Sequence, residues 1–222
     1  MSLNIYSFIF PLMVLTSCSE ATKLDEIRII NNDLTEAKYS KDKVKTISKY
    51  KPLYIGKIKR EITLSDSIDT DERFYSSGFN KFNDSLYSQI EIYVDTSKTI
   101  SMSYENFFLS KPTEKLKSFP VFVSNISNDT TLVSIDNLPF YLEAKQEDGE
   151  WKRIQRQEFL PCSFGSPHYY LGPKEILVTG CRIFKGDTKV KLRLAFDMFT
   201  NQEPLLSNEF HGHIFKEILG SN

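Results

Sequence analysis

The sequence predicts an all-β protein built as an antiparallel β-sandwich. Apolar and polar residues alternate with period two along many short segments, turn-forming sequences separate these segments, and a helical period is almost absent. The composition, 40% hydrophobic and 13% aromatic, is that of a chain that packs a core. A domain of about 165 residues buries roughly 70% of its unfolded surface, so we expect it to fold without a cofactor.

The strands are predicted in chain order from the alternation. Residues 57–64 form the first, and residues 90–94 and 100–104, joined by a turn at 95–98, predict a hairpin. Further strands are predicted over residues 119–123, 132–135, 138–144, 151–154, 176–184, 189–196 and 210–214. Asp148-Gly149 predicts a tight hairpin turn before the strand that carries Trp151.

The N-terminus predicts an export signal. Residues 1–19 carry no charged side chain, and the apolar run 5–15 is too short to span a membrane but suits the core of a signal peptide. The segment Leu15-Thr16-Ser17-Cys18 resembles the bacterial lipobox. This resemblance implies a lipoprotein signal peptide over residues 1–17 and a mature protein anchored in the membrane by fatty acids on Cys18.

Residues 18–51 are polar and rich in lysine after the lipidated cysteine, which predicts a tether. About thirty flexible residues would hold the folded part roughly 30 Å from the lipid. The β-sandwich domain is then predicted over residues 52–218; the length also accommodates two smaller units that meet near residues 105–118. The expected location is the cell envelope, with a lipid anchor in the outer membrane, on either its periplasmic or its surface side.

The C-terminal half contains strand and turn sequences that together resemble a family. They are Phe119-Pro120-Val121-Phe122-Val123, Gly149-Glu150-Trp151-Lys152-Arg153-Ile154, Leu192-Arg193-Leu194 and Ser207-Asn208-Glu209-Phe210. They resemble Bacteroidota lipoproteins with an immunoglobulin-like β-sandwich domain, a family without an established activity. The resemblance implies the fold and a place in the envelope, and it assigns no functional residue.

The segment 163–173 is the most distinctive loop of the sequence. Aromatic side chains gather between glycines and prolines, which is typical of binding loops at the end of a β-sandwich. The residues that we predict to contact a partner are Phe164, His168, Tyr169 and Tyr170. The alternative is that the aromatic side chains of this loop close the end of the core.

Cys162 and Cys181 remain once Cys18 is acylated. An even number of cysteines in an exported protein predicts a disulfide bond, and two buried free thiols are the alternative. His211 and His213 lie two residues apart, but a metal site needs further ligands, so a solvated surface pair is expected. The acidic residues near Asp66 lack the glycine of a calcium-binding loop.

The sequence holds no recognisable catalytic motif, and a net charge of −1 gives no basic surface for nucleic acid. We therefore expect a protein that is not an enzyme, holds no metal or cofactor, contacts the membrane through its lipid, and binds a protein or glycan partner or serves as a scaffold. Two alternatives are an immunity or inhibitor lipoprotein that neutralises an enzyme or toxin, and an envelope hydrolase that uses carboxylates.

Overall fold

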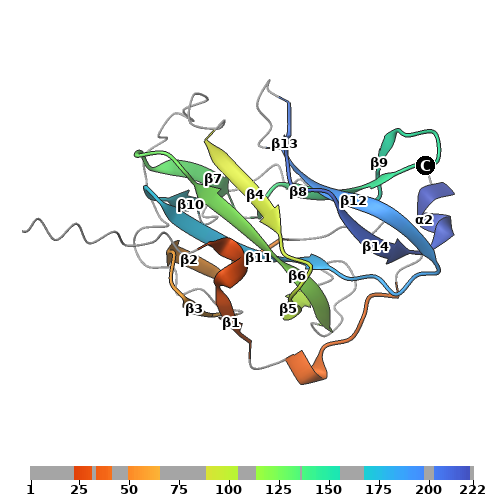
Figure 1. Ribbon diagram of the computed structural model, residues 1–222, viewed down its shortest axis with the longest axis horizontal. Helices are drawn as coiled ribbons and strands as arrows, with labels where there is room; N and C mark the ends of the chain where they lie inside the picture. Colours follow the sequence, from red (N-terminus) through yellow and green to blue (C-terminus); the bar gives the residue numbers. More distant parts are fainter. Residues whose placement is uncertain are drawn as a thin grey trace, which may run out of the picture.

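The computed structural model describes residues 23–31, 34–41, 50–65, 89–104, 114–135, 137–155, 168–197 and 203–220. The described chain is nearly all β (Figure 1), which confirms the predicted fold class. Its α-helix is the short C-terminal α2, Lys216–Gly220. Among these residues, no helix is long and apolar enough to cross a membrane. The signal peptide and Cys18 lie outside the described residues.

The first sheet has the strand order β2-β11-β6-β4, and β5 also pairs with β6. Its strands are β2 (Tyr54–Lys57), β4 (Ile90–Val94), β5 (Ile100–Tyr104), β6 (Glu114–Asn125) and β11 (Glu175–Arg182). All of these pairings are antiparallel. In this order β4 is the last strand, so one of its sides has no strand beside it in the described part of the chain.

The predicted hairpin of residues 90–104 is wrong. β4 pairs with β6 from Ile90↔Asn125 to Val94↔Val121, and β5 continues along the same side of β6 from Ile100↔Ser118. The turn between them is a local interruption, after which the chain resumes its earlier direction. The long strand β6 can pair with both because its 12 residues exceed their combined length.

The second sheet has the order β13-β12-β8-β9, and β14 also pairs with β12. Its strands are β8 (Phe140–Lys145), β9 (Trp151–Arg153), β12 (Thr188–Phe196), β13 (Leu205–Leu206) and β14 (Phe210–Ile214). β8 and β9 form the predicted hairpin, in which Gly149 has a φ of 92°, a conformation that glycine adopts without a steric penalty.

The two sheets enclose one apolar core, as expected of a sandwich. Val121 and Val123 of the first sheet are fully buried and belong to the same cluster as Leu142 and Leu194 of the second. Figure 1 shows the first sheet toward the left and centre and the second toward the right. A shorter antiparallel pair, β7 (Thr131–Ile135) with β10 (His168–Leu171), adds Tyr169 to this core. The immunoglobulin-like arrangement implied by the resemblance stays a prediction.

The N-terminal segment covers the outer face of the first sheet, so the predicted tether is wrong for residues 23–31 and 34–41. This cover contains η1 (Leu24–Glu26), β1 (Arg28–Ile30), η2 (Leu34–Glu36) and β3 (Glu61–Thr63), with β1 and β3 paired in parallel. Ile27 and Ile62 are buried against Phe122 of β6. Leu116 and Phe122 make parts of the outer face of β6 apolar, and the hydrophobic effect holds the N-terminal segment against them.

The boundaries of the domain change accordingly. Folded structure begins by Lys23 rather than at residue 52, and Tyr50, 1% exposed, belongs to the main core. The predicted strand 57–64 is too long: Lys57 is the last residue of β2, residues 58–60 lie in no strand, and Glu61–Thr63 form β3, which pairs with β1. The alternative boundary near residues 105–118 would place β5 and β6 in different units, although these two strands pair with each other.

Candidate functional site

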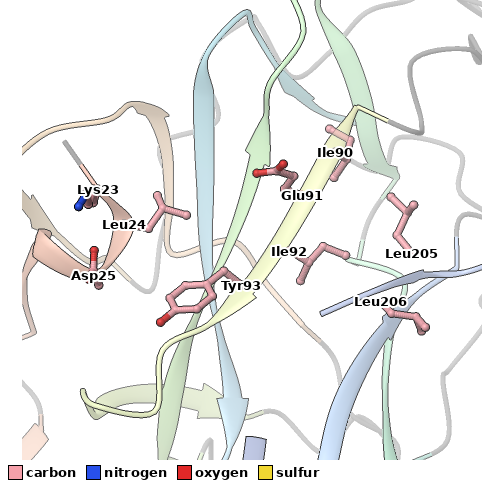
Figure 2. A pocket seen from close by; sticks show the side chains of 9 residues that line it. All are labelled: Lys23, Leu24, Asp25, Ile90, Glu91, Ile92, Tyr93, Leu205 and Leu206. Atoms are coloured by element: carbon pink, nitrogen blue, oxygen red, sulfur yellow. The ribbon is translucent and has the colours of Figure 1, made fainter. Parts of the chain in front are cut away.

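A groove of about 790 Å³ follows β4, the edge strand of the first sheet. Its lining residues are Lys23, Leu24, Asp25, Ile90, Glu91, Ile92, Tyr93, Leu205 and Leu206. Figure 2 shows the residues of the η1 region on one side of β4 and the leucines of β13 on the other. The groove is therefore bounded by the N-terminal cover of the first sheet and by the edge strand of the second.

The peptide groups near the ends of β4 show which residues face β6. The Asp95 N–H donates to the Pro120 carbonyl at 3.0 Å, and the Ile126 N–H donates to the Gln89 carbonyl at 3.0 Å. Between these two bonds the register with β6 is unbroken. Peptide groups alternate in direction along an antiparallel strand, so the odd-numbered residues face β6 and the even-numbered ones face outward.

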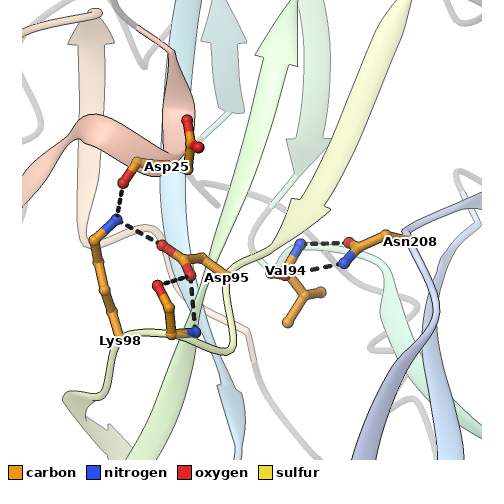
Figure 3. Close-up of polar contacts among 6 residues, drawn as sticks. Asp25, Val94, Asp95, Lys98 and Asn208 are labelled. Carbon is orange, nitrogen blue, oxygen red and sulfur yellow. Dashed lines mark hydrogen bonds and ion pairs between the residues drawn. The ribbon is translucent and has the colours of Figure 1, made fainter.

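The outward-facing groups are satisfied at only one end of β4. Val94 donates its N–H to Asn208 Oδ1 at 2.7 Å and accepts a hydrogen bond from Asn208 Nδ2 at 3.1 Å, as Figure 3 shows. The Asn208 side chain thus occupies the place that a neighbouring strand would take. The N–H and C=O groups of Ile90 and Ile92 point in the same direction, and within the described residues no strand pairs with them.

One wall of the groove is held by a buried carboxylate. Asp95, 2% exposed, accepts hydrogen bonds from Lys98 Nζ at 2.6 Å and from the Ser97 N–H at 2.9 Å. Lys98 also donates to the Asp25 carbonyl of η1 at 2.6 Å (Figure 3). Burial raises the pKa of the Asp95 carboxyl, but the bonds from Lys98 and Ser97 outweigh burial and hold it below its usual value. This network ties η1 to the turn after β4.

The opposite wall is β13 with the residues that follow it. Leu205 packs against the main core, whereas Leu206 is 47% exposed. The Ser207 hydroxyl accepts the Leu194 N–H at 2.9 Å and donates to the Asn208 carbonyl at 2.8 Å. These bonds fix the backbone that carries Asn208, so the point where the wall meets β4 is well defined.

The groove combines an apolar floor with charged rims. Ile90 and Ile92 direct their side chains into the core, and Leu24 and Tyr93 both pack against the buried cluster on the outer face. Three exposed charged residues, Lys23, Asp25 and Glu91, complete the lining. A ligand that fits this arrangement would offer backbone hydrogen bonds and apolar contact.

The predicted contact residues are not gathered in one loop. His168, Tyr169 and Tyr170 begin β10, and Phe164 lies outside the described residues. Tyr169 is 8% exposed and belongs to the main core, so for this residue the alternative of a core role is right. His168 and Tyr170 are half-buried with their rings 6.4 Å apart, and their contact with a partner stays a prediction.

Cys181 is fully buried in the main core, and its sulfur has no disulfide partner among the described residues. In the thiol form, burial raises its pKa to about 12. Cys162 lies outside the described residues, and the predicted disulfide between the two stays a prediction.

The structure places His211 and His213 on the exposed side of β14, as the alternation predicted. The described residues contain no group of three His, Cys, Asp or Glu side chains that could hold a metal ion. The acidic residues around Asp66 lie outside the described part of the chain.

Sequence reasoning missed the groove because its residues are far apart in the chain. The alternation of residues 90–94 predicts a strand, but nothing in it shows that β4 ends a sheet. Comparisons of the chain with models of protein families, with curated proteins and with solved structures found no match.

Proposed function

We propose that this protein is a lipid-anchored, non-catalytic binding protein of the bacterial cell envelope that holds a partner in the groove along β4. The observation that supports binding is the sheet edge at Ile90 and Ile92, where peptide groups face an apolar groove. Unpaired strand edges are sites where another chain adds to a sheet, and folded proteins usually protect them. An edge left open between two walls suits a binding site.

The lipobox-like segment at Cys18 supports the location, together with the resemblance to immunoglobulin-like Bacteroidota lipoproteins. Lys23 lines the groove and follows Cys18 by only a few residues. Even a fully extended chain spans at most about 18 Å over that interval. A lipid on Cys18 would therefore keep the bound partner close to the membrane, rather than roughly 30 Å away as a long tether would.

The immunity or inhibitor alternative is the case in which the partner is an enzyme or toxin, and it would use the same groove. A hydrolase would instead be favoured by a cluster of buried acids. Among the described residues, the carboxylate that is buried is that of Asp95, and Lys98 and Ser97 both hold it. The arrangement of this carboxylate is therefore that of a structural turn.

Photo-crosslinking in intact cells of the source bacterium tests the proposed site. A benzophenone amino acid replaces Leu206 in the groove or, as a control, Ile58, which is also exposed but does not line the groove. We expect one partner to be captured from position 206 and not from position 58. Capture at neither position, or equally at both, would contradict a binding role for the groove.

The anchor is tested separately with a labelled fatty acid. We expect the wild-type protein to incorporate the label and the Cys18→Ala variant to lack it. Loss of the anchor should also reduce capture from position 206 if the partner resides at the membrane. Label that persists in Cys18→Ala would show that the lipoprotein assignment is wrong.

A further inference from the structure

We propose that the groove binds an extended peptide segment of its partner, which adds to the first sheet as a strand beside β4. This inference rests on the proposed binding function and names its ligand class. It is carried by the direction of the peptide groups in β4 and by the way Asn208 already bonds to Val94. The segment would be apolar at alternate positions and basic between them.

The Asn208 side chain shows that a peptide-like group fits beside β4. Its amide donates to the Val94 carbonyl and accepts from the Val94 N–H, which is the pair of bonds that an antiparallel strand makes at such a residue. The next equivalent positions are Ile92 and Ile90, about 6.8 Å and 13.6 Å farther along the strand. A ligand of about four residues in strand conformation would reach both.

The side chains of β4 determine which side chains the ligand should carry. Residues directly opposite each other in neighbouring strands point to the same face of the sheet. The residues opposite Ile90 and Ile92 would therefore point toward the core side, where Leu205 offers apolar contact. The residue between them would lie opposite Glu91, whose exposed carboxylate favours lysine or arginine.

Glu91 also argues against a second copy of this chain as the occupant. Antiparallel pairing of β4 with itself that uses both Ile90 and Ile92 places Glu91 opposite Glu91, and like charges in that position are destabilising. The register centred on Ile92 instead places Ile90 opposite Val94, whose outward groups are already bonded to Asn208. A partner peptide with a basic residue avoids both conflicts.

Two short peptides test the strand addition. The probe acetyl-Thr-Val-Lys-Val-Thr-amide and its counterpart with Glu in place of Lys are titrated into the full-length, isotope-labelled chain in detergent micelles. We expect the lysine probe to shift the amide signals of Ile90 and Ile92, to slow their hydrogen exchange, and to bind about threefold more tightly than the glutamate probe. The Glu91→Lys variant, altered at an exposed side chain, should reverse this preference.

N-methylation separates strand pairing from simple apolar contact. A lysine probe that carries N-methyl groups on both valines keeps its side chains but loses the N–H groups that would face β4. We expect its affinity to fall roughly tenfold or more. Equal binding of the methylated and unmethylated probes, or an unchanged charge preference in Glu91→Lys, would overturn the proposal.

The same exchange measurement identifies other occupants. Protection of Ile90 and Ile92 that appears without peptide and grows with protein concentration would assign the edge to a second copy. Protection that is independent of concentration would assign it to another segment of this chain. Either result overturns peptide addition. Crosslinking from position 206 without probe binding would refute strand addition alone, whereas the absence of both would refute the binding function as well.

Discussion

β10 and β4 both direct apolar side chains into the core, yet they differ in how their backbones are paired. In β10 the aromatic residue Tyr169 points into the core, and the strand is paired with β7. In β4 the side chains of Ile90 and Ile92 also point into the core, but their peptide groups face a groove. Aromatic content favours β10 as a contact surface, whereas the peptide groups of β4 that no described strand pairs with favour β4.

The largest expected effect separates the two faces of β10. Tyr169→Ala removes a ring that is 8% exposed and should lower the free energy of unfolding by about 3 kcal/mol, because truncating a buried aromatic residue leaves a cavity. Its neighbour Tyr170 is half-buried, so Tyr170→Ala is the matched control and should cost about 1 kcal/mol. Urea denaturation measures both. Equal losses would show that the two faces of β10 are not distinct.

The Asp95 network should matter next. Asp95→Asn weakens the bond to Lys98 and should lower stability by about 2 kcal/mol at neutral pH. The pKa of the Asp95 carboxyl is lowered in the folded state, so its contribution is present above the unfolded pKa, near 3.8, and is lost as the pH falls through the lower folded value.

Denaturation curves of wild type and Asp95→Asn at several pH values check this prediction. The difference in stability should be constant above the unfolded pKa of Asp95 and should shrink in more acidic solution. Lys98→Met tests the same contact from the other side and should also loosen η1, because Lys98 bonds to the Asp25 carbonyl. A gap between wild type and Asp95→Asn that widens with acid would contradict the role given to Asp95.

A smaller effect is expected at Val94, the end of β4 where Asn208 bonds to the outward-facing peptide groups. Asn208→Ala removes both bonds to Val94 and should lower stability by about 1 kcal/mol, because the freed groups of Val94 can then bond to water. Asn208→Asp keeps the acceptor but loses the donor. The Val94 amide should exchange with solvent faster in Asn208→Ala than in Asn208→Asp, and equal rates would contradict the bonding described for Asn208.

The fold class could be predicted because, along much of the chain, apolar residues alternate with polar ones, as in strands with one buried face. In β12 the apolar residues Leu192 and Leu194 alternate with charged ones, and this strand has the predicted position within one residue. The cover of residues 23–41 was missed, although the sequence contained a sign of it. Phe122 stands between two valines in an uninterrupted apolar run, which is typical of a strand buried on both faces. Such a strand requires a second layer.

The candidate site could not be predicted in this way. β6 pairs with β4 on one side and with β11 on the other, and no described strand pairs with the far side of β4, so its place at the edge depends on pairings between distant residues. The bond that closes one end joins residues 114 positions apart. Local alternation indicates which side chains are buried, but it contains no information about which strand lacks a neighbour.

The smallest expected effect on stability concerns Leu206, the exposed leucine that lines the groove. Leu206 is 47% exposed, so Leu206→Ser should change the free energy of unfolding by only about 0.5 kcal/mol, close to the change expected for Ile58→Ser at a similarly exposed position. If the groove exists to bind a partner, the two variants should differ in function. Leu206→Ser should weaken binding of the lysine probe, because it removes apolar surface beside Ile92, whereas Ile58→Ser should leave binding unchanged. A large loss of stability in Leu206→Ser would show that the groove supports the fold itself. Binding that is unchanged in both variants would place the contact surface elsewhere, with His168 and Tyr170 of β10 as the next residues to test.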